Sequence, residues 1–430
     1  MAGWSNWAGN QSASGITVET PRSVQDVSAI VTRGGKVKAA GSGHSFSAIG
    51  RPEQVLLDMS GLQGLRRVDR DSGLVTVGAG TTLALLNRLL ADEGLAMTNL
   101  GDIESQTISG AISTGTHGTG RAFGGLATQV AALEMVLADG TVVDCSAGER
   151  PELWSAARVG LGALGIVTAV TLRCEPLFAL HAEEGPLPLD ELLDRFDELV
   201  AGNDHFEAYW FPHTRWTLTK RNNRLPLAEG LEKLPAWKEW LDDEFLSNTV
   251  FGWVVAAGKR WPGLVPLGNR VAAKALGTRS FTDVSYKVFT SPRRVRFREM
   301  ELAIPAAAMV DAVREVTAAI ERSGLRVSFP VELRVAAADD IPLSTASGRD
   351  SGYLAFHLPA TVDHRRYFGL VSSVLEAYTP RPHWGKLHDL DADALRGRYP
   401  RFDEFVALRD RLDPEGVFSN EHLDRVLGRK

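Results

Sequence analysis

Two glycine-rich stretches carry the residue types that a phosphate-containing cofactor needs. The first, Gly41-Ser42-Gly43-His44-Ser45, follows a short strand-like run, and the second spans residues 109–120 around His117. Glycine and small hydroxyl residues leave the backbone open to close approach, and amides that converge in such a loop bind phosphate. Either loop alone is more typical of a structural turn. Two in one region, each with a histidine, suggest a phosphate-rich cofactor laid along the backbone.

A third glycine run, residues 160–165, fits the G-x-G-x-x-G string of dinucleotide-binding proteins. That motif requires a strand before the glycines and a helix after them, so that the pyrophosphate meets the helix N-terminus. Here residues 151–159 look helical and residues 166–172 are β-branched, so the order is reversed. We therefore expect a tight helix-to-strand turn and not a nicotinamide site.

A charged pair follows much later, in Glu332-Leu333-Arg334. On a strand these two charged side chains point the same way, because successive residues alternate between faces. As a pair on an exposed strand they would be unremarkable.

A zinc site is the competing interpretation of the histidines. Both His383 with His388 and His44 with His117 lack the cysteine or carboxylate ligands that a closed zinc site needs. We therefore expect no metal.

The elements that must position these residues mix helices with strand pairs. Residues 36–40 read as a strand leading into the first loop, and residues 82–93 as a helix with Gly94 just past its end. Residues 130–145 contain two apolar runs around Asp139-Gly140, which is the signature of a β-hairpin. This mixture predicts an α+β fold and not repeated βαβ units.

The sequence changes character near residues 177–189, which are acidic and interrupted by proline, and we place a domain boundary there. Beyond it, residues 305–322 are predicted as a helix with Pro305 at its first position and Gly324 just past its end. Residues 401–412 form a second amphipathic pattern, which residues 413–416 end.

Composition excludes several classes of protein. The chain has 430 residues, 44% of them hydrophobic, and 47 basic against 53 acidic side chains give a net charge of −6. This balance is that of a globular protein with large cores, and it leaves no basic footprint for nucleic acid. No stretch approaches 18 uninterrupted apolar residues, so we expect no membrane-spanning segment.

Cys145 and Cys174 are too few for a disulfide framework and predict buried thiols in a reducing cytoplasm. A local basic cluster, Arg293-Arg294-x-Arg296-x-Arg298, is typical of a solvated strand face and leaves peripheral membrane contact open.

The chain resembles the vanillyl-alcohol-oxidase-type FAD flavoenzymes in three motifs. These are Gly41-Ser42-Gly43-His44-Ser45-Phe46, Gly115-Thr116-His117-Gly118-Thr119-Gly120 and His383-Trp384-Gly385-Lys386. Within that family it is most similar to the aldonolactone oxidoreductases, which include L-gulono-1,4-lactone oxidase and dehydrogenase and D-arabinono-1,4-lactone oxidase. The likeness runs nearly end to end, from residue 4 to residue 418, and the order of the motifs makes it specific.

The resemblance implies FAD joined covalently to His44, since a neutral imidazole is a nucleophile for the flavin 8α-methyl position. Such a tether raises the flavin potential and prevents loss of the cofactor. A histidine that only hydrogen-bonds phosphate is the alternative for His44, and His117 either orders its loop or touches the flavin. Further FAD contacts are implied on Gly41, Ser42, Gly43, Ser45, Thr107, Gly110, Ala111, Ile112, Ser113, Val167 and His383.

The same resemblance assigns catalytic roles to Glu332, Arg334 and Lys386. Arg334 would hydrogen-bond substrate oxygen or reduced flavin, and Glu332 would bind sugar hydroxyls. Lys386 would place a cation beside the flavin N1–C2=O edge, where hydride transfer leaves negative charge. Substrate contacts are implied for Asp102 and His357.

Gly101 occupies the position that controls access of dioxygen to the flavin in relatives, and glycine there favours an oxidase. The alditol-oxidising branch has serine at the position of Asp102 and threonine at that of His357. These departures favour a lactone ring over an open-chain polyol, and an alditol oxidase acting on xylitol or sorbitol is the alternative.

We therefore predict an α+β, two-domain FAD-binding fold of the vanillyl-alcohol-oxidase type. Residues 1–175 would bind FAD, residues 176–380 would form an α+β cap, and residues 381–430 would complete the FAD domain and active site. The predicted reaction is oxidation of an aldono-1,4-lactone at C2 by hydride transfer to flavin N5. Dioxygen, giving hydrogen peroxide, or an electron-acceptor protein would reoxidise the flavin, and L-gulono-1,4-lactone would lead to L-ascorbate.

Overall fold

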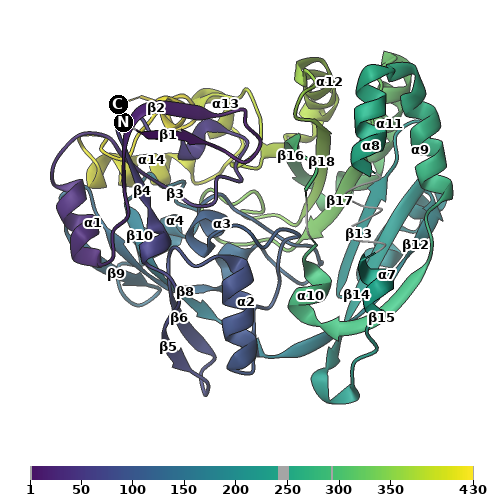
Figure 1. Cartoon of the computed structure of the whole chain (residues 1–430). Coiled ribbons are helices and arrows are strands. Elements are labelled where there is room, and N and C mark those ends of the chain that lie inside the picture. Colours follow the sequence, from purple (N-terminus) through teal and green to yellow (C-terminus); the bar gives the residue numbers. More distant parts are fainter. Residues whose placement is uncertain (1, 241–250, 292–293, 430) are drawn as a thin grey trace.

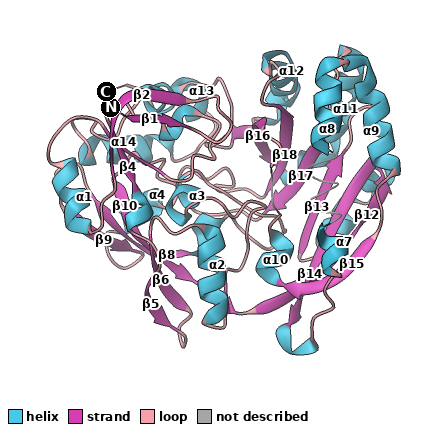
Figure 2. Cartoon of the chain, viewed as in Figure 1, coloured by secondary structure: helices cyan, strands magenta, loops and turns pink. Residues whose placement is uncertain are grey.

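The computed structural model describes residues 2–240, 251–291 and 294–429. Helices and strands are mixed along the whole described chain, which confirms the predicted α+β class (Figures 1 and 2). Arg293, part of the basic cluster noted in the sequence, lies outside the described residues.

Two sheets form the N-terminal part of the molecule. One has four strands in the order β1 (Ala2–Ser5), β2 (Ser12–Glu19), β4 (Val55–Asp58) and β3 (Val37–Ala40). The other has five strands in the order β5 (Leu65–Asp69), β6 (Leu74–Gly78), β10 (Ile166–Arg173), β8 (Val130–Val136) and β9 (Val142–Ser146). The helices of this part are α1 (Val24–Val31), α2 (Leu83–Asp92), α3 (Ile108–Ser113) and α4 (Pro151–Ala157), and β7 (Leu95–Ala96) pairs with β11 (Glu175–Pro176).

An eight-stranded sheet dominates the rest of the chain (Figure 1). Its strands run in the order β15 (Arg279–Val284), β12 (Phe178–Pro188), β14 (Trp216–Pro226), β13 (His205–Trp210), β17 (Val331–Ala336), β18 (Ser351–Pro359), β16 (Phe297–Pro305) and β19 (Arg381–Pro382). One face packs its apolar residues against α5 (Leu189–Asp194), α6 (Phe196–Ala201), α11 (Met309–Ser323) and α12 (Arg365–Leu375). Because side chains alternate along a strand, the residues between them point to the opposite face.

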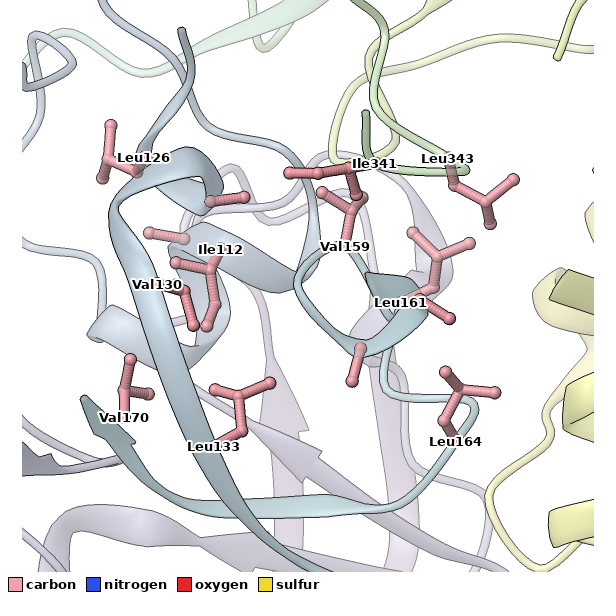
Figure 3. Packing of buried hydrophobic residues seen from close by; sticks show 14 of the residues in the cluster. Ile112, Leu126, Val130, Leu133, Val159, Leu161, Leu164, Val170, Ile341 and Leu343 are labelled. Atoms are coloured by element: carbon pink, nitrogen blue, oxygen red, sulfur yellow. The ribbon is translucent and has the colours of Figure 1, made fainter. Parts of the chain in front are cut away.

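The largest described core joins segments that are far apart in the sequence. Figure 3 shows Ile112 of α3 and Leu133 of β8 in this core, together with Ile341 and Leu343 from a loop after β17. The C-terminal helices α13 (Ala392–Arg396), α14 (Phe402–Leu412) and α15 (Glu421–Leu427) contribute to the same core. The last fifty residues therefore pack with the N-terminal part of the molecule.

Most local predictions near the glycine loops are confirmed. Thr82 caps α2, Gly94 follows it with φ of 72°, and β8 and β9 form the expected hairpin. Residues 160–165 connect α4 to β10, so the run is the helix-to-strand turn expected.

The prediction of a helix beginning at Pro305 was wrong. Pro305 ends β16, where it pairs with Ser351, and α11 begins only at Met309. Proline fits the end of a strand as well as the first turn of a helix, so the presence of a proline alone does not distinguish the two.

The remaining described α-helices are α7 (Ala236–Glu239), α8 (Phe251–Arg260), α9 (Val265–Lys274) and α10 (Ser285–Phe289). Among the described residues, no helix combines the length and the apolar character needed to cross a bilayer.

Candidate active site

Charged side chains occupy the sheet face opposite the packed helices. On β13 and β17, alternation directs Glu207, Tyr209, Glu332 and Arg334 to this face. Arg334 donates from Nε to Glu207 over 2.9 Å and pairs through Nη2 with Glu332. The Tyr209 hydroxyl lies 3.0 Å from Glu207 and 3.1 Å from Glu332, so it bridges the two carboxylates.

The pKa values of the two carboxylates in this cluster are shifted in opposite directions. Burial raises the pKa of Glu332, and the nearby charges of Glu207 and Asp102 add to that effect against the opposing Arg334. Burial also acts on Glu207, but Arg334 and Lys220 more than offset it and its pKa is lowered. Glu207 is therefore the ionised member, and Glu332 is the one suited to exchange a proton.

A second cluster lies beside the first, on β16 and the loop after β19. Lys386 pairs with Glu299, and its Nζ lies 3.9 Å from Glu301. His357 Nε2 is 3.5 Å from Glu299. Burial raises the pKa of Glu299, but Lys386 and His357 outweigh it and hold that pKa at about 2. This cluster therefore keeps a half-buried cation beside an ionised carboxylate.

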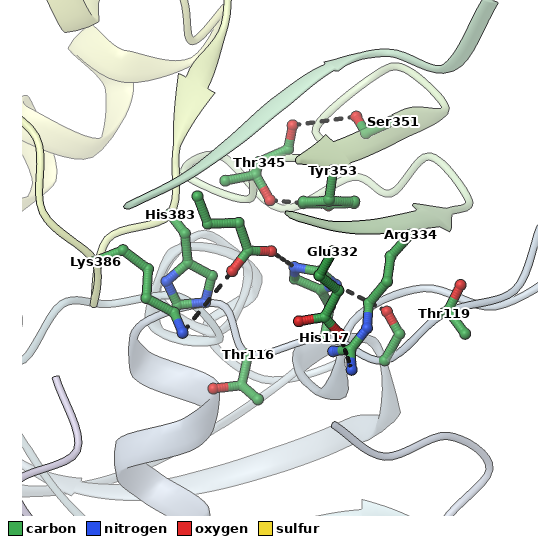
Figure 4. Close-up of polar contacts among 12 residues, drawn as sticks. Thr116, His117, Thr119, Glu332, Arg334, Thr345, Ser351, Tyr353, His383 and Lys386 are labelled. Carbon is green, nitrogen blue, oxygen red and sulfur yellow. Dashed lines mark hydrogen bonds and ion pairs between the residues drawn. The ribbon is translucent and has the colours of Figure 1, made fainter. Parts of the chain in front are cut away.

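His117 connects the second glycine loop to this cluster (Figure 4). Its Nδ1 lies 2.8 Å from the carbonyl oxygen of Gly118, and its Nε2 lies 2.5 Å from Glu301. Both partners are oxygen acceptors, and they hold the buried ring between the loop and β16. The ring also stacks on Tyr353 at 3.7 Å. His117 thus orders its loop against the sheet, which is one of the two roles considered from the sequence.

Gly101 and Asp102 approach the clusters from the N-terminal part. A Cβ at Gly101 would lie 3.1 Å from the His117 carbonyl oxygen and 3.2 Å from Thr116 Cγ2, so there is little space for a side chain at this position. Asp102 lines a small cavity together with Glu207 and Arg334. It also accepts a hydrogen bond of 3.1 Å from the Ser291 hydroxyl.

A long cleft lies between β3, α3 and the 160–165 turn. It encloses about 970 Å³, including space open to solvent, which is within the range of cofactor sites. The structure brings nine of the predicted FAD contacts to this cleft: Gly41, Ser42, Gly43, His44, Ser45, Thr107, Gly110, Ser113 and Val167.

The cleft walls fit a phosphate-rich cofactor. Within the described chain, no hydrogen bond to the protein engages the backbone N–H groups of residues 42–45. A Cβ at Gly41 would lie 2.3 Å from Thr107 Oγ1, and Gly43 has φ of 69°. Both positions therefore require glycine, and the open amides supply donors for a pyrophosphate.

His44 enters this cleft as a neutral ring. Its Nε2 lies 2.8 Å from the Ser105 hydroxyl, and the ring stacks on Trp7 with centroids 5.3 Å apart. Burial lowers the pKa of His44 to about 4, and the charge of Lys386 contributes. A neutral imidazole keeps a nitrogen lone pair at pH 7, which a nucleophile needs.

The loop of Gly385 and Lys386 joins the cleft to the charged sheet face. The Phe46 amide donates to the Gly385 carbonyl oxygen over 2.6 Å, and the Ser47 hydroxyl donates to that of Trp384 over 2.8 Å. The His44 loop and the Lys386 loop therefore form one unit. Figure 4 shows Lys386 and His383 on one side of the charged face and Arg334 on the other.

Three of the predicted FAD contacts lie elsewhere. The side chains of Ala111 and Ile112 are fully buried in the core beneath α3, and Figure 3 shows Ile112 there. His383 is buried near Glu301 and His117, and burial lowers its pKa to about 4.

Sequence reasoning missed several residues of the site. Glu299 and Glu301 alternate with apolar residues along β16, and that period of two was a readable signal. Lys38 lines the cleft, and its Nζ donates to the carbonyl oxygens of Gly162 and Phe418 over 3.1 and 2.8 Å. The turn at residues 160–165, interpreted only as a connection, also lines the cleft through Leu161, Gly162 and Gly165.

Two known protein families match this chain, one in each part of it. Residues 170–426 match the D-arabinono-1,4-lactone oxidase family, and residues 16–146 match the FAD binding domain family. The chain belongs to the D-arabinono-1,4-lactone oxidase family. Its N-terminal domain is an FAD-binding domain, which identifies the cofactor as FAD.

Relatives of this family match along the whole chain. L-gulono-1,4-lactone dehydrogenase of Mycobacterium tuberculosis (strain ATCC 25618 / H37Rv) is 41% identical over 99% of both chains. L-gulonolactone oxidase of Bos taurus is 33% identical over 98% of this chain and 97% of its own. Alditol oxidase of Streptomyces sp. (strain IKD472 / FERM P-14339) is 32% identical over 98% of both chains.

Among solved structures, cholesterol oxidase from B. sterolicum shares the fold. It superposes with a TM-score of 0.83 at 17% identity, over 99% of this chain and 96% of its own. This confirms the predicted fold type for the FAD-binding and cap architecture.

Proposed function

We propose that this protein oxidises an aldono-1,4-lactone, such as L-gulono-1,4-lactone, at C2. The observation that carries the proposal is the junction of two features. His44 lines a cleft fitted to FAD, and the Phe46–Gly385 hydrogen bond joins the His44 loop to the charged face. Family membership and the relatives' names support the substrate class.

Bound FAD would supply the acceptor, at N5, for the hydride on substrate C2. Arg334 would hold a ring or hydroxyl oxygen of the lactone with the guanidinium that now pairs with Glu207 and Glu332. Glu332, whose pKa burial raises, would take the hydroxyl proton. Lys386 would oppose the negative charge that develops at the cofactor edge in a site from which water is excluded.

Asp102 and His357 would recognise the remaining hydroxyl groups. Asp102 lines the same cavity as Arg334, and His357 lies at the Glu299 end of the face. An acidic group and an imidazole replace the serine and threonine expected of the alditol-oxidising branch, which supports a lactone over a polyol. Alditol oxidation remains the second candidate because an alditol oxidase is among the full-length relatives.

We further propose a covalent bond between His44 and the flavin 8α-methyl position. The neutral ring in the wall of the cleft, with the Ser105 hydroxyl 2.8 Å from Nε2, supports this role. Retention of yellow colour by the unfolded, washed chain is the test, and its loss on denaturation would contradict the bond.

The second acceptor would be dioxygen, with hydrogen peroxide as product, or an electron-transfer protein. Gly101 supports dioxygen because it adds no side chain beside Thr116. With L-gulono-1,4-lactone the 2-keto product would enolise to L-ascorbate, and with D-arabinono-1,4-lactone to its five-carbon analogue. Peroxide measured during turnover distinguishes the acceptors.

We propose the predicted domain division, 1–175, 176–380 and 381–430, and a reducing compartment such as the cytoplasm. Strand β10 of the five-stranded sheet ends at Arg173, and β12 of the eight-stranded sheet begins at Phe178, which supports the first boundary. Cys145 and Cys174 are buried free thiols, which supports the reducing compartment. Limited proteolysis and cell fractionation test these two points.

Anaerobic titration tests the substrate. L-gulono-1,4-lactone, D-arabinono-1,4-lactone, xylitol and sorbitol would each be added to oxidised enzyme, and the flavin absorbance followed. We expect a lactone to bleach the flavin at lower concentration and higher rate than either polyol. Faster bleaching by a polyol would favour the alditol oxidase, and no bleaching by any of the four would contradict both.

A further inference from the structure

An exposed apolar stripe runs along α9, on the helical layer of the eight-stranded sheet. Leu264, Leu267 and Val271 are 49%, 58% and 59% exposed, and their spacing of three and four places them on one face. Val265 and Ala273 on the opposite face are buried. The inner face of α9 therefore packs on the protein while a second apolar surface faces outward.

An aromatic residue and basic residues border this stripe. Trp261, just before the helix, is 56% exposed, and the Arg260 guanidinium carbon lies 5.6 Å from its ring centroid. Lys259, Arg270 and Lys274 are exposed as well. On the helix, Arg270 and Lys274 follow Leu267 and Val271 by three residues each, so they flank the stripe.

The surrounding sequence has a charge opposite to that of the whole protein. Residues 245–282 contain no aspartate or glutamate and five basic residues, whereas the chain carries a net charge of −6. This part of the chain is therefore locally basic in a protein whose net charge is negative.

We infer that this surface, defined by Trp261, Leu264, Leu267, Val271 and their basic neighbours, binds the face of an anionic lipid bilayer. Apolar side chains enter the boundary between headgroups and acyl chains, and tryptophan prefers that depth. Lysine and arginine beside them pair with anionic headgroups. Figure 1 shows α8 and α9 at the side of the molecule away from the N-terminal domain, so they are accessible to a flat surface.

A second copy of this chain could also cover the stripe, but charge repulsion opposes such a dimer. In a two-fold symmetric dimer the same patch meets itself. The basic residues of one stripe would then face those of its partner, with no acidic residue from 245 to 282 to neutralise them. A membrane rich in anionic lipid supplies that neutralisation.

Co-sedimentation of the full-length holoenzyme with vesicles tests the inference. Vesicles of phosphatidylcholine alone would be compared with vesicles that also contain phosphatidylglycerol, at low and high salt. We expect binding to the anionic vesicles only, and weaker binding at high salt. Lys259→Gln with Lys274→Gln should weaken it about 25-fold, at about fivefold for each basic residue.

Leu267→Ser with Val271→Ser should weaken the binding at least about tenfold through lost apolar burial. Two control pairs change basic and apolar residues elsewhere: Arg88→Gln with Arg173→Gln, and Val18→Ser with Val142→Ser, all at exposed positions. These control pairs should bind like wild type, and circular dichroism would establish that every variant is folded.

Absence of binding to anionic vesicles at low salt would overturn the inference, as would equal losses in the control pairs. Sedimentation velocity tests whether a second copy of this chain occupies the stripe instead. A dimer that dissociates on Leu267→Ser with Val271→Ser, without lipid binding, would assign the stripe to a second copy.

Discussion

Replacing Arg334 with methionine removes the positive charge at the centre of the proposed substrate site and keeps much of the side chain's bulk. The guanidinium lies between two buried carboxylates, 2.9 Å from Glu207 through Nε and paired with Glu332 through Nη2. Without it, both carboxylates remain around the Tyr209 hydroxyl with one cation fewer. One of them must then take up a proton, and Glu332, whose pKa burial already raises, is the one expected to do so.

The expected size of the effect follows from this burial. Arg334 is 12% exposed and Glu207 9%, so solvent screens the pair little. Removal of one member of a buried ion pair costs about 3–5 kcal/mol, which includes the penalty of the charge left behind. The loss of one charge-stabilising donor at a reacting centre lowers kcat by about 10²–10³-fold. We therefore expect kcat/KM for the lactone to fall by about 10²–10³-fold, with FAD still bound in a cleft that Arg334 does not line.

The assay is steady-state kcat/KM with L-gulono-1,4-lactone and an artificial acceptor, with FAD content measured in the same samples. Arg279→Met is the matched control, because Arg279 pairs with Glu184 over 2.7 and 3.0 Å at the far edge of the same sheet. It should lose stability but keep kcat/KM. If Arg334→Met retains FAD and its kcat/KM stays within about threefold of wild type, below 1 kcal/mol, the charged face does not bind the substrate.

Three further predictions concern the histidines, the dioxygen path and the flavin bond. Burial lowers the pKa of His422 to about 3 and that of His388 well below its usual value, so both fold as neutral rings. The contribution of His422 to the stability is complete above pH 6.5 and is lost as pH falls toward 3, by about 1.4 kcal/mol per pH unit. His422→Gln should therefore flatten the dependence of the melting temperature on pH between 6 and 4, and an unchanged slope would contradict this. Gly101→Ala, whose Cβ would crowd the His117 carbonyl oxygen at 3.1 Å, should slow reoxidation by dioxygen at least about tenfold while reduction by the lactone stays unchanged in stopped flow; equal reoxidation rates would exclude a role in dioxygen access. Ser105→Ala removes the 2.8 Å hydrogen bond to His44 and should slow covalent FAD attachment about fivefold, measured by the fluorescence of denatured protein bands, and attachment at the wild-type rate would show that Ser105 does not orient the ring.

Local patterns in the sequence predicted the loops and the elements around them. The strand into Gly41, the cap at Thr82 and the hairpin at Asp139-Gly140 depend on neighbours a few residues away, and each is found as expected. The predicted helix at Pro305 failed because proline fits two local roles. The partner strand at Ser351, far along the chain, decides between them.

The charged face was predicted only in part. Resemblance supplied Glu332, Arg334 and Lys386, whereas their partners Glu207, Glu299 and Glu301 were not identified. These partners come from strands β13 and β16, and their contacts depend on pairing such as Tyr209 with Glu332, 123 residues apart. A period of two marks which residues share a face, but sheet order and register are tertiary properties that one strand does not encode.

The mass of the intact, acid-denatured chain tests the central claim most directly. The account predicts an increase by the mass of one FAD in wild type, and an unmodified mass for His44→Ala that still binds FAD without the bond. A colourless wild-type protein with an unmodified mass that takes up no FAD would contradict the flavoenzyme account. An unmodified mass in a yellow protein that bleaches with lactone would retain the reaction and reject only the bond at His44.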